Sequence, residues 1–260
     1  MSEPFPQMKL DAERVLIDAI VEHEPSHVFA LFSGGNDSTV LVSWAKRTIG
    51  HKLDAAVFVD TGTALPGVRE FVEAFCDNRG VPLLVYEAGD EYDRMVLEHG
   101  FPGPASHRFA YVRLKERQID ALVRDHKTHP RDRIMLLTGV RRAESTRRMG
   151  TTAPVKRDGS QVWVAPLIDW TNDDMRSYRE RHDLEQSDVA ALIHMSGECN
   201  CGAFAAPGER EEKRSIWPVW WAERIAPLEE ATGTKWGERR DEVPAKAGPM
   251  CGDCQLRIAA

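Results

Sequence analysis

The feature of this sequence that most constrains its fold is a regular alternation of short apolar segments with amphipathic ones between residues 11 and 182. Short apolar runs bounded by turn residues predict buried strands, and apolar residues three and four apart predict helices. The predicted strands are 27–32, 54–59, 81–85, 133–138 and 162–165. The predicted helices are 11–23, 38–48, 66–79, 91–99, 110–126 and 171–182. Strands that alternate with helices are joined by right-handed crossovers, so we predict an α/β fold with a mostly parallel five-stranded sheet and helices on both faces.

The first predicted strand runs directly into a loop of glycines and small polar residues, followed by a helix. The loop consists of Ser33, Gly34, Gly35, Asn36, Asp37, Ser38 and Thr39. Glycine lets the backbone approach an anion closely, and the start of a helix offers unpaired N–H groups and a positive dipole to a phosphate. We therefore predict a phosphate-binding loop, to which the hydroxyls of Ser33, Ser38 and Thr39 add hydrogen bonds. Asp37 has two interpretations, as a ligand of a phosphate-bound Mg²⁺ or as a cap of the helix.

Two further polar loops follow predicted strands. Asp60-Thr61-Gly62 comes after the second strand, and Gly139 after the fourth. Because ligands bind at the carboxyl ends of parallel strands, these loops and the Ser33 loop are expected to form one site. The alternative for Asp60, Thr61 and Gly62 is a simple turn.

The charge of the chain is negative overall but uneven. The formal net charge is −7, which argues against broad, non-specific affinity for nucleic acid. One stretch is basic, with Arg131, Arg133, Arg141, Arg142, Arg147 and Arg148. This local basic patch predicts a defined anion site, and any contact with a nucleic-acid substrate would be local or assisted by a partner. The alternative is a solvated loop.

The 260 residues suffice for one large domain, or for a domain with an appendage. No basic flank and apolar stretch follows the start Ser2-Glu3-Pro4, and no apolar run is long enough to span a bilayer, so we expect a cytoplasmic protein without membrane contact. After about Ser187 the pattern changes to more tryptophan, proline and cysteine without clear strands. We predict a nucleotide-binding domain over 1–186 and a cysteine-rich C-terminal subdomain over 187–260.

Five cysteines divide into one single residue and two close pairs. Cys76 lies among apolar residues of an amphipathic helix and is predicted to be a buried structural thiol. The pairs are Cys199 with Cys201 and Cys251 with Cys254. In a reducing compartment, four such thiols favour a metal centre, either an iron–sulfur cluster or tetrahedral Zn²⁺. A disulfide and unligated thiols are the remaining alternatives.

The loop Ser33–Thr39 resembles the pyrophosphate loop (PP-loop) of the ATP-pyrophosphatase and phosphoadenosine phosphosulfate (PAPS) reductase superfamily. Asp60-Thr61-Gly62 is similar to its Asp-Thr-Gly segment, which contacts the nucleotide. The stretch 139–148 resembles the family's Gly-x-Arg-Arg-x-x-Ser-x-x-Arg element, and 166–170 its Pro-Leu-x-x-Trp stretch, in which we expect Trp170 to pack in the core. The resemblance implies an adenine-nucleotide α-hydrolase-like fold.

The resemblance also assigns roles to residues. Nucleotide contacts fall on the PP-loop, on the Asp-Thr-Gly segment and on Gly139, Val140, Arg141, Arg147 and Arg148. The catalytic residues are then Asp37, Ser38, Arg141 and Arg142, with the arginines gripping phosphate oxygens. Asn36 stands where lysine is commoner in the superfamily. His107 and Lys115 occupy the stretch in which reductases recognise their substrate.

The stretch 214–223 between the cysteine pairs contains Arg214, Trp217, Trp220 and Trp221, and it resembles the arginine- and tryptophan-rich stretch of assimilatory adenylyl-sulfate reductases. In those enzymes two adjacent cysteines and a later Cys-x2-Cys hold a 4Fe–4S cluster, whereas this chain has Cys-x-Cys for the first pair. The resemblance implies a 4Fe–4S cluster here, with Zn²⁺ as the alternative. The Glu-Cys-Gly-Leu-His element that carries the reductases' nucleophile does not occur in this sequence, which argues against reductive chemistry.

The sequence thus favours an ATP pyrophosphatase that binds ATP and Mg²⁺ and adenylates a substrate, releasing pyrophosphate. It most resembles the ATP-pyrophosphatase component of DNA phosphorothioation and RNA thiolation systems, in which a cysteine desulfurase supplies sulfur. One alternative is a sulfonucleotide reductase that releases sulfite. A second alternative is a subunit that binds ATP without turnover.

Overall fold

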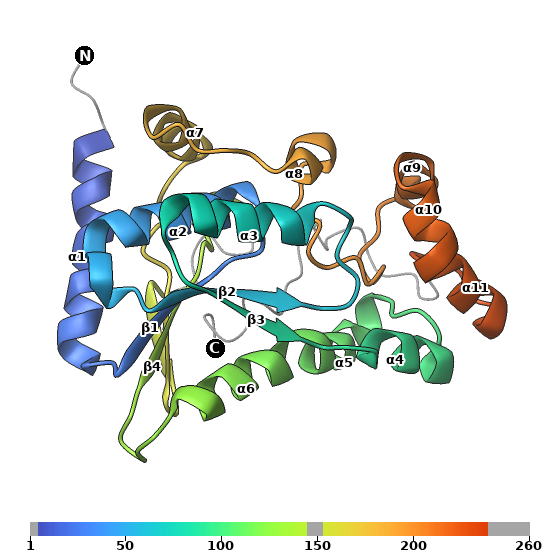
Figure 1. Cartoon of the computed structure of the whole chain (residues 1–260), viewed down its shortest axis with the longest axis horizontal. Coiled ribbons are helices and arrows are strands. Elements are labelled where there is room, and N and C mark those ends of the chain that lie inside the picture. Colours follow the sequence, from blue (N-terminus) through green and yellow to red (C-terminus); the bar gives the residue numbers. More distant parts are fainter. Residues whose placement is uncertain (1–4, 145–152, 239–260) are drawn as a thin grey trace.

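A six-stranded sheet forms the centre of the molecule, and the computed structural model describes residues 5–144 and 153–238 (Figure 1). The strand order is β3-β2-β1-β4-β6-β5. The strands are β1 (His27–Leu31), β2 (Ala55–Asp60), β3 (Leu83–Glu87), β4 (Ile134–Leu137), β5 (Val155–Asp158) and β6 (Gln161–Val164). All neighbouring pairs are parallel except β5 with β6. The α/β class and the mostly parallel sheet are confirmed.

The predicted number of five strands is wrong, because β5 was missed. Its four residues read Val-Lys-Arg-Asp and are exposed or half-buried, so they lack the apolar run that marks the other strands. The strand forms through a hairpin in which Asp158 pairs with Gln161, and Gly159 in the turn has φ of +59°. Pairing with β6 and a tight turn, rather than burial, make this segment a strand.

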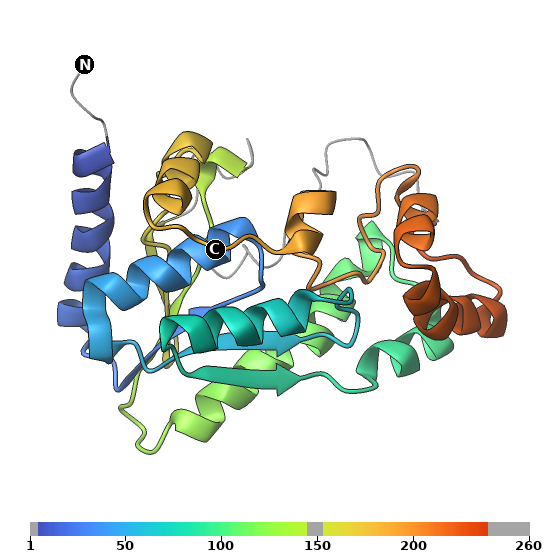
Figure 2. The same ribbon diagram turned by 45° about the horizontal axis from the view of Figure 1, so that its top comes forward.

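Helices lie on both faces of the sheet (Figures 1 and 2). The longer ones are α1 (Phe5–His23), α2 (Asn36–Ile49), α3 (Val68–Arg79), α4 (Glu91–His99), α6 (Arg117–His126) and α7 (Asn172–Arg181). The shorter ones are α5 (His107–Tyr111), α8 (Asp188–Ile193), α9 (Glu209–Ile216), α10 (Pro218–Trp220) and α11 (Ala226–Thr232). A π-helical stretch, Val112–Glu116, joins α5 to α6, so the single predicted helix over 110–126 is observed with a local widening.

Successive side chains of the strands enter two different cores, as the pleat of a strand requires. Ala30, Phe58 and Leu137 pack with residues of α1, α2, α3 and α7. Phe29 and Trp163 belong to the opposite core, which is closed by α6. Both faces are therefore buried, and the polar loops at the strand ends are the places left for a ligand.

The elements after residue 187 cover the far end of the sheet and contact α4 and α5. Trp221 and Trp236 pack in one cluster with Tyr92 and Phe101. As expected, the described residues 187–238 contain helices and no strand. Whether this part is a separate subdomain stays a prediction.

Several local features fit the sequence around them. Pro82 directly precedes β3, and this strand lies at the edge of the sheet, where a residue without an N–H is tolerated. Thr171 caps α7, since its hydroxyl accepts the Asp174 N–H at 3.2 Å. Trp170 and Cys76 are both buried in the core, and burial raises the pKa of the Cys76 thiol to about 12.

Candidate nucleotide site

A cavity of about 600 Å³ opens at the carboxyl ends of β1 and β4. These strands are neighbours, and the chain passes from β1 to β2 on one side and returns to β4 on the other, which is the switch point where α/β sheets bind ligands. The walls come from the PP-loop, the loop after β4, α7, the helical stretch containing Lys115, and residues 194–200. The cavity is thus lined from both sides of the predicted domain boundary.

The PP-loop is ordered by its own hydroxyls at the start of α2. The Ser38 hydroxyl accepts the Ser33 N–H at 3.2 Å and donates to the Gly35 carbonyl at 3.0 Å. The Thr39 hydroxyl also donates to Gly35, at 2.9 Å. Ser33, Gly35, Asn36, Asp37 and Ser38 line the cavity. Gly34 and Thr39 are not part of the described lining, and their contact with a nucleotide stays a prediction.

Two glycines are required by the close approach of backbone segments. Gly34 has φ of +74°, a conformation that other residues rarely adopt. At Gly139, an added Cβ would lie 3.2 Å from the backbone carbon of Asp37. The loop after β4 is therefore packed directly against the start of α2, as expected for two loops of one site.

Arg141 is buried and holds Asp37 in place. The residue is 4% exposed, and its guanidinium donates to the Asp37 carboxylate at 3.0 Å. It also donates to the Trp170 carbonyl at 3.2 Å and to the Asn172 amide oxygen at 3.0 Å. These bonds fix the guanidinium from three sides, so in this structure Arg141 orients Asp37 from within the wall of the cavity.

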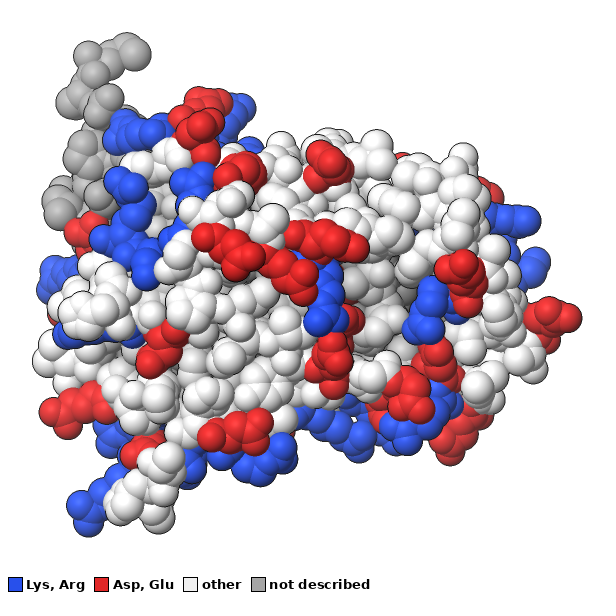
Figure 3. Space-filling view, viewed as in Figure 1, with Lys and Arg blue, Asp and Glu red and all other residues white. Residues whose placement is uncertain are grey.

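The predicted basic patch is divided between the two ends of β4. Gly139, Val140 and Arg141 line the cavity after the strand. Arg131 and Arg133 precede the strand and lie at its other end, beside a second depression of about 450 Å³. The prediction of one continuous basic patch is therefore wrong for these residues. On the face shown in Figure 3, acidic and basic side chains are interspersed.

The remaining predicted arginines lie elsewhere. Arg142 is absent from the cavity lining as far as the structure describes it, and its guanidinium is paired with the Asp169 carboxylate. Arg147 and Arg148 lie outside the described residues.

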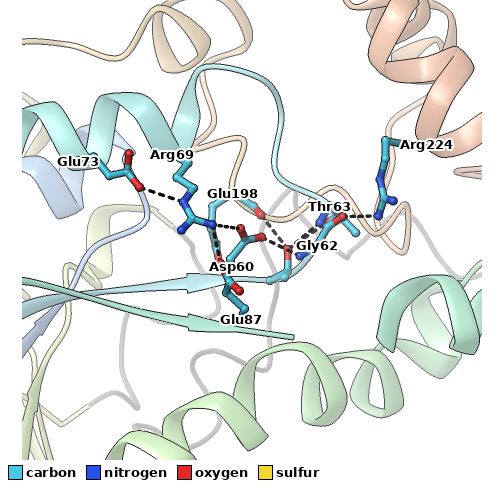
Figure 4. Close-up of polar contacts among 9 residues, drawn as sticks. Asp60, Gly62, Thr63, Arg69, Glu73, Glu87, Glu198 and Arg224 are labelled. Atoms are coloured by element: carbon cyan, nitrogen blue, oxygen red, sulfur yellow. Dashed lines mark hydrogen bonds and ion pairs between the residues drawn. The ribbon is translucent and has the colours of Figure 1, made fainter. Parts of the chain in front are cut away.

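The Asp60–Gly62 loop is turned toward the C-terminal elements and is not part of the described cavity lining (Figure 4). Thr61 is completely buried, and its hydroxyl donates to the Glu198 carbonyl at 2.9 Å. The Asp60 carboxylate accepts the Gly62 N–H at 2.9 Å and faces Arg69 at 3.4 Å. The Gly62 carbonyl accepts a bond from Arg224 at 3.0 Å. Here the polar groups of the loop join two parts of the chain.

Two of the four predicted metal ligands can be placed. Cys199 lines the cavity, and Cys201, two residues further along the chain, is buried. Interaction with the Cys201 thiol, with the nearby Lys115 ammonium as a smaller contribution, lowers the pKa of Cys199 well below its ordinary value, whereas interaction with Cys199 and burial raise the pKa of Cys201. Cys251 and Cys254 lie outside the described residues, and within the ranges 5–144 and 153–238 no three His, Cys, Asp or Glu side chains are grouped as for a metal.

A partly buried ion pair lies beside Cys199. The Lys115 ammonium is 2.8 Å from the Glu198 carboxylate, and both residues line the cavity. Lys115 therefore reaches the site, as the sequence suggested. His107, the other substrate-side candidate, is buried against Phe204 and is not among the residues that line the cavity.

Sequence reasoning missed several residues of the cavity. Asn172, Met175 and Arg179 of α7 line it and are spaced by three and four, so one face of this helix carried a detectable signal. Ser196 and Glu198 come from an irregular segment, and nothing in their local sequence indicated that the chain returns there.

The chain was compared with known protein families and structures. The model of the phosphoadenosine phosphosulfate reductase domain family matches residues 27–190. The chain belongs to this family. A phosphoadenosine 5′-phosphosulfate reductase of Xylella fastidiosa is 28% identical over 203 residues, which cover 74% of this chain and 79% of that protein.

Two solved structures have a similar fold at low sequence identity. The PAPS reductase of Candida auris, solved as a phosphate complex, has a TM-score of 0.53 at 14% identity and covers 74% of this chain and 92% of its own. The U34-tRNA thiolase of Methanococcus maripaludis, solved with its 4Fe–4S cluster, has a TM-score of 0.50 at 14% identity and covers 87% of this chain and 76% of its own. The chain therefore shares its fold with this PAPS reductase and with this tRNA thiolase. None of its described helices has the length and apolar composition that crossing a bilayer requires.

Proposed function

We propose that this protein is an ATP pyrophosphatase that adenylates a substrate and releases pyrophosphate. The observation that carries the proposal is the PP-loop at the start of α2, where Ser33, Gly35 and Ser38 line the cavity. N–H groups and hydroxyls at a helix start bind the oxygens of a polyphosphate. Val57, Ile119 and Val140 supply apolar surface to the same cavity, which suits a nucleotide base.

In the proposed reaction, an oxygen of the substrate attacks the α-phosphorus of ATP. The new P–O bond forms as the bond to the β-phosphate bridging oxygen breaks, pyrophosphate leaves, and the proton of the attacking group passes to solvent. The PP-loop holds the leaving phosphates, and the Ser38 hydroxyl turns from the Gly35 carbonyl to donate to one of their oxygens. Positioning and electrostatic stabilisation suffice for this chemistry, so no protein nucleophile is required.

Asp37 is the residue that we propose as the ligand of Mg²⁺. It lines the cavity, and its carboxylate is held by Arg141 at 3.0 Å. Mg²⁺ in nucleotide sites is bound through one or two carboxylates together with phosphate oxygens, which fits a single oriented aspartate. The ion would neutralise charge on the phosphates.

A sulfonucleotide reductase is the second candidate function. The family and the names of the relatives favour it, and one observation adds to them, because the Cys199 thiol lines the same cavity as the PP-loop.

We propose that Cys199, Cys201, Cys251 and Cys254 hold a 4Fe–4S cluster, with Zn²⁺ as the alternative. Cys199 and Cys201 are separated by one residue, and a lowered pKa at Cys199 favours the thiolate that binds metal. A cluster beside the cavity would supply an iron site for sulfur. A cysteine desulfurase as sulfur donor and a nucleic acid as the adenylated substrate complete this proposal, as in DNA phosphorothioation.

The test is incubation of the protein with ATP and Mg²⁺, with AMP and pyrophosphate measured separately from sulfite formed from sulfonucleotides. Pyrophosphate release is expected, and it should fall at least about 100-fold in Ser38→Ala and Asp37→Ala, since each removes a group placed on the phosphates. Ser177→Ala removes an exposed hydroxyl of α7 outside the cavity and should change nothing.

Thioredoxin-dependent sulfite release without pyrophosphate would replace the proposal by the second candidate. Tight ATP binding without either product would instead indicate a non-catalytic subunit. Metal analysis of anaerobically purified protein tests the cluster, and a colourless protein with stoichiometric zinc would contradict it.

A further inference from the structure

Arg179 of α7 differs from the other cations that line the cavity. Lys and Arg side chains in the described lining are Lys115, Arg141 and Arg179. Lys115 is paired with Glu198 at 2.8 Å, and Arg141 with Asp37 at 3.0 Å. Arg179 has no ion-pair partner among residues 5–144 and 153–238. Arg179 is therefore the cation of the described lining that is not paired with a described carboxylate.

The guanidinium of Arg179 is also held beside the PP-loop. Its Nη1 donates to the side-chain oxygen of Asn36 at 2.8 Å, and Asn36 is the first residue of α2. Its Nε is buried without a hydrogen-bond partner within the described part of the chain. Both Arg179 and α2 lie on the same side of the sheet, since α7 and α2 cover one face (Figures 1 and 2).

We infer that Arg179 binds the phosphate oxygens of the nucleotide held by the PP-loop, and that Asn36 positions it. A buried Nε and an uncompensated charge are both costly unless a ligand completes them, and a phosphate provides the acceptors that a planar guanidinium fits. Arg141, fixed by three bonds to the protein, then acts through Asp37, while Arg179 contacts the ligand itself. This inference rests on the proposed nucleotide site but not on which reaction follows.

The experiment measures binding of ATP, AMP and inorganic pyrophosphate to the full chain by calorimetry. In Arg179→Met, the dissociation constants for ATP and pyrophosphate should rise at least about tenfold, as expected for the loss of a charge-assisted contact, and that for AMP should change far less. Arg176→Met is the matched control, because Arg176 lies one turn earlier on α7, is exposed and is paired with Asp173. It should bind all three ligands as the unaltered protein does.

A second variant separates a ligand contact from a merely structural role. Asn36 reaches the guanidinium, so a lysine at position 36 would bring an ammonium to nearly the same place. Asn36→Lys combined with Arg179→Met should recover most of the lost pyrophosphate affinity, which a disturbed helix would not do. Unchanged pyrophosphate binding in Arg179→Met, or no recovery in the double variant with its thermal unfolding intact, would overturn the inference. If the affinities change as expected in these variants but the unaltered protein releases no pyrophosphate from ATP, only the proposed function is overturned.

Discussion

Two loops at neighbouring strand ends use their hydroxyl groups in different ways. The hydroxyls of the PP-loop after β1 bond within that loop, and Ser33, Asn36 and Ser38 line the cavity. The loop after β2 bonds to residues far along the chain, with Thr61 donating to Glu198 and the Thr63 hydroxyl accepting the Asn200 N–H at 2.9 Å. A polar loop at the carboxyl end of a parallel strand is therefore not by itself a binding loop. Whether it can bind a ligand depends on which partners already hold its hydrogen-bonding groups.

The largest effect is expected when a bulky side chain is introduced into the PP-loop, which tests whether this loop binds the nucleotide. A Cβ at Gly35 would lie 3.0 Å from the Cβ of Ser196, so Gly35→Val forces either the loop or the opposite wall to move. We expect ATP affinity to fall about 100-fold, or about 3 kcal/mol, because every N–H of the cradle is displaced. Calorimetry measures the affinity, and Gly103→Val is the control, since Gly103 has φ of −105° and open space around an added Cβ. Equal affinities in the two variants would contradict a phosphate cradle at Gly35.

The second test removes the bonds of the other loop. Thr61→Val keeps the shape of the side chain but leaves the buried Glu198 carbonyl without the Thr61 hydroxyl. We expect the free energy of unfolding to fall by about 1–2 kcal/mol with the dissociation constant of ATP unchanged. Chemical denaturation and calorimetry measure the two quantities. A large loss of ATP affinity at full stability would instead support the nucleotide contact that the resemblance to Asp-Thr-Gly segments implies.

The smallest effect is expected at Asp60. In Asp60→Asn the side-chain oxygen can still accept the Gly62 N–H, and only the ion pair with Arg69 is weakened. Arg69 keeps Glu87 at 2.6 Å and Glu73 at 3.0 Å (Figure 4). Because this pair is partly exposed, we expect less than about 1 kcal/mol of destabilisation, decreasing further in high salt. Urea unfolding at two salt concentrations measures it, and a loss above that range would mean that Asp60 does more than orient this turn.

The sequence predicted those features that depend on neighbouring residues. The alternation of apolar runs identified five of the strands, and the Ser33–Ser38 spacing identified the loop that lines the cavity. Strand β5 was missed because its stability comes from pairing and not from apolar side chains. The basic patch was misjudged because residues close in sequence are separated by the length of β4.

The opposite wall could not be predicted for a different reason. Ser196 meets the PP-loop although the two are more than 150 residues apart, and no local pattern encodes such a contact. From the sequence, Arg179 could be placed only on one face of a predicted helix. Its hydrogen bond to Asn36 depends on how α7 packs against α2, which the sequence did not reveal.

The return of residues 194–200 to the PP-loop also has a consequence for how the protein is made. Synthesis proceeds from the N-terminus, so the PP-loop and β1 leave the ribosome long before the segment that faces them. Contacts between distant parts of the chain form slowly, because a large loop must close first. A nascent chain can thus form much of the sheet before residues 194–200 complete the wall of the cavity. The proposed binding of ATP would then be one of the last properties that the growing chain acquires.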